Sequence, residues 1–145
     1  MDRKLVLGTT AFAVLSVLLG LIVNVLLELA GAKGFVVDQV GTFLIAVPLA
    51  LIAARRAGRV SRISVLFASV AIAAAALWAI VYTLNAIAEP VGGHVGWSNL
   101  LNSMNWQNTV FGTTAMLLVP QLWLSVLNRV AANNSFKPRP LRGSA

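Results

Sequence analysis

The sequence contains no cysteine, a single histidine and only four acidic residues among its 145. The absence of cysteine excludes disulfides, thiolate nucleophiles and thiolate metal sites. Zinc sites usually carry at least two His or Cys ligands, so the lone His94 predicts no metal site, and paired-histidine haem ligation is excluded by the count. No serine has a recognisable base partner, and no glycine-rich phosphate loop is present. The sequence therefore predicts no cofactor and no catalytic residues, which favours a non-enzymatic role.

Charge is also scarce, at 10% of residues, whereas apolar residues make up 59%; soluble domains carry about a quarter charged residues. A helix rises about 1.5 Å per residue, so crossing a hydrocarbon core of about 30 Å takes roughly 20 apolar residues. Four segments reach that length, and because lipid offers no hydrogen-bond partner, each must be helical. We therefore expect an all-α membrane protein, an up-down bundle of four transmembrane helices within one domain, 1–130. The spans fall at about 5–27, 36–54, 63–88 and 109–128.

Basic residues give the direction of each span, because short loops rich in Lys and Arg stay in the cytoplasm. Ten of the eleven basic residues fall on one side of the predicted membrane, and only Lys33 falls on the other. Both termini and the loop 55–62 are therefore predicted to be cytoplasmic. The net charge of +7 is explained by this asymmetry, so we expect the lipid bilayer as partner and no nucleic acid. The ten are Arg3, Lys4, Arg55, Arg56, Arg59, Arg62, Arg129, Lys137, Arg139 and Arg142.

The two outer loops differ in length. The first is short and contains Gly31 and Gly34, so the first two helices are expected to be antiparallel neighbours. The second, 89–108, is too long for a turn and carries a helical period of its own. We expect a short helix lying at the outer interface there. Its apolar positions are Trp97, Leu100, Leu101 and Met104.

The middle of every span lacks ionisable residues, which usually mark a proton or ion pathway. Small multidrug transporters share this size and four helices, but they carry a membrane-embedded Glu in their first helix. Here the corresponding candidate, Glu28, lies at the outer end of its span. The pattern therefore argues against a proton-coupled antiporter of that type.

Weaker polar and small residues follow helical rows, and two interpretations remain open. Small residues in such rows let helix backbones approach, so the first interpretation is helix packing. The second is an outward-facing polar vestibule that binds or transports a small cationic or amphipathic molecule. The helix-packing candidates are Ser16, Gly20, Ala71, Ala75 and Gly112. The ligand-binding candidates are Asn24, Glu28, Asp38, Tyr82, Asn85, Glu89, Trp97 and Trp106.

The C-terminal segment 131–145 is polar and basic, and its prolines and lack of an apolar face predict a disordered cytoplasmic tail. Its end reads Ser135-Phe136-Lys137-Pro138-Arg139-Pro140-Leu141-Arg142-Gly143. This run resembles the read-through ends of proteins carried on bacterial chromosomal integron gene cassettes. The resemblance covers about a dozen residues and implies a mobile bacterial gene, and hence the bacterial inner membrane. The membrane body resembles uncharacterised small bacterial four-helix membrane proteins.

Together these patterns predict a small polytopic inner-membrane protein that acts through helix-helix contacts, as an accessory, immunity or defence component. Its expected partner is a second copy of the chain or another membrane protein. Binding or transport through the outer vestibule is the alternative.

Overall fold

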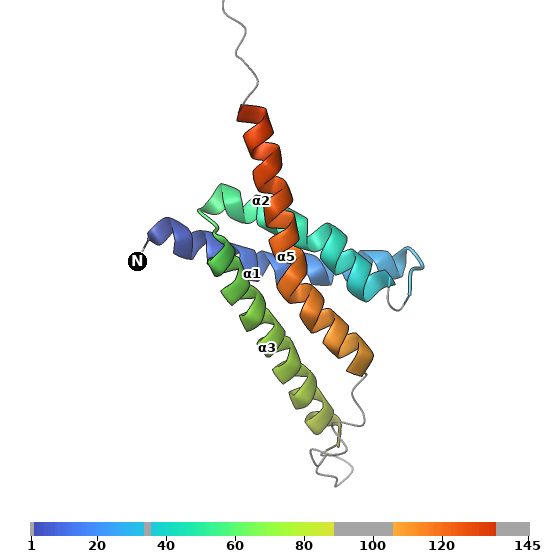
Figure 1. Cartoon of the computed structure of the whole chain (residues 1–145). Helices are drawn as coiled ribbons and strands as arrows, with labels where there is room; N and C mark the ends of the chain where they lie inside the picture. The colour runs from blue at the N-terminus through green and yellow to red at the C-terminus, as the bar shows by residue number, and fades with distance from the viewer. Residues whose placement is uncertain (1, 34–35, 89–105, 136–145) are drawn as a thin grey trace, which may run out of the picture.

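The computed structural model describes residues 2–33, 36–88 and 106–135, and this part of the chain is entirely helical, with no strand. Four helices in it are long and apolar enough to cross a membrane, one for each span that the sequence predicts. The second of them begins as a π-helix and continues without a break as an α-helix (Figure 1). The elements are α1 (Arg3–Leu29), η1 (Val36–Ala46), α2 (Val47–Ala57), α3 (Arg62–Ala88) and α5 (Trp106–Ser135).

Helix α1 packs antiparallel to η1 and α2, as the short first loop predicts. At one end, the backbone N–H of Arg59 donates to the carbonyl of Lys4 at 2.8 Å. Towards the other end, the hydroxyl of Thr42 donates to Oδ1 of Asn24 at 3.5 Å. The two contacts join opposite ends of the pair, so the first two helices are neighbours along their whole length.

Helices α3 and α5 form a second antiparallel pair that crosses the first one (Figure 1). α3 starts close to α1 and diverges from it along its length. The buried core lies where the two pairs cross, and it joins residues from every helix. Its members include Phe12, Phe43, Leu51, Val65 and Leu124.

The helix ends follow from local sequence. α1 ends in a Schellman motif, in which Gly31 N–H donates to Glu28 and Ala32 N–H to Leu27, both at 2.9 Å. Gly31 has φ +89°, a conformation that favours glycine. At the start of α3, the backbone N–H groups of Ser61 and Ser64 donate to each other's hydroxyls at 2.9 and 3.1 Å. This reciprocal cap satisfies two donors that the first helical turn leaves unpaired.

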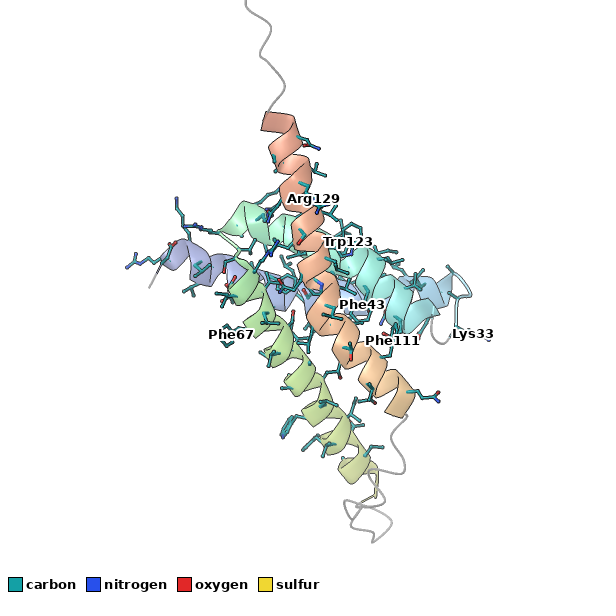
Figure 2. The ribbon with its side chains drawn as sticks, viewed as in Figure 1. Lys33, Phe43, Phe67, Phe111, Trp123 and Arg129 are labelled. Carbon is teal, nitrogen blue, oxygen red and sulfur yellow. The ribbon has the colours of Figure 1, made fainter. Side chains whose placement is uncertain are left out.

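The change from π- to α-helix coincides with Pro48, in the first turn of α2. The i to i+5 pattern of a π-helix would pair the Phe43 carbonyl with the N–H of residue 48, but proline has none. That carbonyl instead accepts a hydrogen bond from Nε1 of Trp123 at 3.0 Å, where α5 crosses η1 (Figure 2). Pro48 therefore leaves free an acceptor that joins two helices through a hydrogen bond.

Helix α5 continues to Ser135 and contains Pro120 within it. Residues 131–135 are therefore helical, where the sequence predicted a disordered tail from 131 onward. The helix continues because the segment before Phe136 contains no proline to stop it. The expected interfacial helix, with Trp97 and Met104, and the cassette-like end of the chain lie outside the described residues.

Candidate functional site

The helix ends that carry basic residues lie together. The guanidinium of Arg55, at the end of α2, donates to Oδ1 of Asn128 near the end of α5. Nη2 of Arg62, at the start of α3, donates to the Ser125 hydroxyl at 3.4 Å, and Gln121 Nε2 donates to the Arg62 carbonyl at 3.1 Å. These contacts join the end of α2 and the start of α3 to the stretch of α5 between Gln121 and Asn128.

Helix α1 packs against this basic end at two glycines, Gly8 in α1 and Gly58 after α2. A Cβ atom added to Gly8 would overlap the backbone of Arg59, and one added to Gly58 would overlap the backbone of Lys4. Arg59 also forms an exposed ion pair with Asp2 at 4.0 Å, which contributes little because solvent screens it. The two glycines therefore permit the closest backbone approach between α1 and the segment that follows α2.

A cavity of about 200 Å³ lies between the helices, on the side of the core away from the basic end. It has a polar side and an apolar side. Its lining residues are Ser16, Val17, Gly20, Leu21, Asn24, Thr42, Val47, Ile72 and Met116. We call it the central cavity, and its lining includes the predicted site residues Ser16, Gly20 and Asn24.

Ser16 and Gly20, predicted to pack helices, both border this cavity. Ser16 is only 5% exposed, and its buried hydroxyl has no hydrogen-bond partner. A Cβ atom added to Gly20 would meet no heavy atom within 4 Å. Gly20 therefore faces open space instead of an approaching helix backbone.

A second, larger hollow of about 610 Å³ separates α1 from the diverging α3. Its walls are apolar, and the predicted packing residues Ala71 and Ala75 belong to its α3 wall. Val17 and Ile72 line both this hollow and the central cavity, so the two are neighbours. The hollow, which we call the α1–α3 groove, is lined by Ala13, Val14, Val17, Leu18, Ala71, Ile72, Ala75, Ala76 and Ala79.

Among the ligand-binding candidates, the structure describes the side chains of Asn24, Glu28 and Tyr82. Asn24 is half-buried and borders the central cavity. Glu28 is exposed, and Tyr82 is 63% exposed and stacked on Trp78 with 5.5 Å between ring centroids. These three side chains do not share one site. The side chains of Asp38, Asn85, Glu89, Trp97 and Trp106 lie outside the described part of the chain.

Two further packing features depend on residues that face each other across helices. A Cβ atom added to Gly112, the remaining packing candidate, would lie 3.6 Å from Nε2 of Gln39, an ordinary contact distance. Gln39 Oε1 is buried without a hydrogen-bond partner. A Cβ added to Gly41 would lie 2.6 Å from Cδ1 of Leu27 and 3.2 Å from Oδ1 of Asn24. Nothing in the spacing along one helix marked Gly8, Gly41 or Gly58, because their neighbours come from other segments.

No group of three His, Cys, Asp or Glu residues within the described ranges is placed to hold a metal ion. Comparison with protein-family models, with curated proteins and with solved structures finds no match to the chain.

Proposed function

We propose that this protein is a multi-pass membrane component that acts without catalysis, by seating a transmembrane helix of a partner membrane protein in the α1–α3 groove. The partner is a second copy of the chain or another membrane protein. Such a partner is what an accessory, immunity or defence component would bind. The groove is the observation that carries this proposal.

The groove has the properties of a helix-docking surface. It lies near the middle of α1 and of α3, so a helix seated there is buried at mid-membrane depth. Its α3 wall contains four alanines, and small residues let two helix backbones approach closely. Lipid chains are as apolar as leucine, so association inside the membrane depends on such packing instead of on hydrophobic burial.

In the proposed topology, four helices cross the membrane in alternating directions, and both termini lie in the cytoplasm of a bacterium. The contacts of Arg55 with Asn128 and of Arg62 with Ser125 support it, since they gather basic helix ends on one side. The divergence of α1 and α3 is compatible with four spans, because transmembrane helices tilt by up to about 40° from the bilayer normal. The proposed location in the bacterial inner membrane is based on the cassette-like tail.

The alternative of an outer vestibule for cations gains no support from the described residues. The lining of the central cavity contains no acidic side chain, and Glu28 is exposed. A cation inside the membrane needs a counter-charge to offset its desolvation.

A matched pair of substitutions tests the docking proposal. Ala75→Leu fills the groove, whereas Ala74→Leu adds the same side chain at an exposed position that is not part of the groove lining. We expect the Ala75→Leu protein, extracted in a mild detergent, to lose the partner chain that the parent and the Ala74→Leu protein retain in native mass spectrometry. Retention of the same partner by both variants, or recovery of lipid alone with the parent, would contradict the proposal.

A further inference from the structure

The hydroxyl of Ser16, like that of Ser69, is buried without a hydrogen-bond partner, whereas some other helix hydroxyls are paired. Thr9, Thr83 and Ser125 each donate to the carbonyl four residues earlier, at 2.7, 2.8 and 2.9 Å. Such a bond satisfies a hydroxyl that has no water around it. Ser16 makes no bond of this kind, although it is buried and faces the central cavity.

The rest of the polar side of the cavity also has hydrogen-bonding capacity to spare. The Thr42 hydroxyl donates to Asn24 Oδ1 at 3.5 Å, the outer limit of a hydrogen bond. The Asn24 amide carries two further donors. Two helical segments, α1 and η1, therefore direct neutral donors and acceptors towards one space, while Val47, Ile72 and Met116 line its apolar side.

The size and the opening of the cavity restrict what it can hold. A volume of about 200 Å³ has room for about six water-sized groups, at about 30 Å³ each. Val17 and Leu21, which form its α1 edge, are 47% and 61% exposed on the outer surface of the bundle. The cavity is therefore open to the bilayer beside Val17 and Leu21, and a ligand reaches it from the lipid.

We propose that the central cavity is a binding site for a small uncharged molecule that carries a hydroxyl or amide group and enters from the lipid. Its polar group hydrogen-bonds to Ser16 and to the pair Asn24 and Thr42, and its short apolar part packs on Met116 and Ile72. The ligand is neutral because the lining has no charged side chain to compensate an ion in a low dielectric. This site is separate from the helix-docking groove, although Val17 and Ile72 border both.

A photoreactive four-carbon alcohol carrying a diazirine tests the proposal on the full chain reconstituted in phospholipid nanodiscs. We expect its adducts, mapped by mass spectrometry, to concentrate in the segment Ser16–Asn24 and at Met116. Excess 1-butanol or butyramide should protect these residues. Butylammonium, which has a similar size and a positive charge, should not.

Two matched pairs of variants separate this site from general lipid exposure. Gly20→Leu extends a side chain into the cavity, because a Cβ atom at Gly20 meets no heavy atom within 4 Å, and should abolish the concentrated labelling; Ala74→Leu should not. Ser16→Ala should weaken butyramide protection by about tenfold, the effect of losing one hydrogen bond in a buried site. Ser69→Ala is its control, since Ser69 is also buried with an unpartnered hydroxyl but lines neither the cavity nor the groove.

Labelling spread evenly over lipid-facing residues, or unchanged by Gly20→Leu, would overturn the proposed site. Protection by butylammonium would overturn the assignment to a neutral ligand. The Ala75→Leu substitution should remove the partner chain and leave this labelling intact. The docking proposal and the ligand proposal can therefore be refuted independently.

Discussion

The hydrogen bond from Trp123 to the Phe43 carbonyl should contribute to stability because of a proline elsewhere in the chain. Trp123→Phe keeps an aromatic ring and removes the Nε1 donor. The Phe43 carbonyl then has no donor in the π-helical pattern, because residue 48 is a proline. Interhelical hydrogen bonds in membranes average about 0.6 kcal/mol, and orphaned buried groups cost about 1–3 kcal/mol. We therefore expect a loss of about 1 kcal/mol from this bond.

A double-mutant cycle separates the free energy lost with this hydrogen bond from the packing lost to the smaller ring of phenylalanine. Pro48→Ala restores an N–H that can donate to Phe43, so Trp123→Phe should cost about 1 kcal/mol less in that background. The free energies of unfolding are to be measured by denaturant titration of all four proteins in one detergent, followed by circular dichroism. Independent sites usually add within about 0.3–0.5 kcal/mol. A coupling energy below that limit would refute the argument that Pro48 makes the Phe43 carbonyl available.

Two further predictions compare substitutions of one kind at two positions. Gly8→Ala should destabilise the protein by about 1–3 kcal/mol because its Cβ overlaps the Arg59 backbone, whereas Gly20→Ala should stabilise it by up to about 1 kcal/mol through helix propensity. Thermal unfolding in detergent checks both, and equal effects would contradict the assigned backbone approach. Ser61→Ala should cost about 1 kcal/mol because Ser64 loses its cap. Ser69→Ala, which removes no hydrogen bond, should cost less by the same measurement, and the opposite ranking would exclude the capping role.

The four spans could be predicted because their cause is local. A run of about 20 apolar residues without charge has few alternatives to a helix across lipid. The antiparallel pairing of α1 with α2 followed from the short loop at Gly31, whose positive φ ends the helix. These features depend on residues close together in the chain.

Features that depend on distant residues could not be predicted from the sequence. The spacing of Ser16 and Gly20 marks a small-residue row, but it does not show that a cavity lies opposite. Gly8 and Gly58 carry no motif on their own helices, and their role becomes evident only when Arg59 reaches Lys4.

The predicted vestibule shows the same limit. The sequence places Asn24, Glu28 and Tyr82 in the outer half of their spans, but depth in a membrane does not determine the face of a helix. Asn24 turns inward to Thr42, while Glu28 and Tyr82 lie exposed. For these three residues, a shared depth does not bring the side chains to one site.

The predicted four-span topology is tested most directly by measuring on which side of the membrane each loop lies. Because the chain has no cysteine, single substitutions at the exposed residues Ala30, Ala57 and Ala131 report position without background and leave every charge in place. In intact cells, a membrane-impermeant maleimide should label Ala30→Cys and should label Ala57→Cys and Ala131→Cys only after permeabilisation. Labelling of all three from outside, or of Ala57→Cys alone, would contradict a four-span protein with both ends in the cytoplasm.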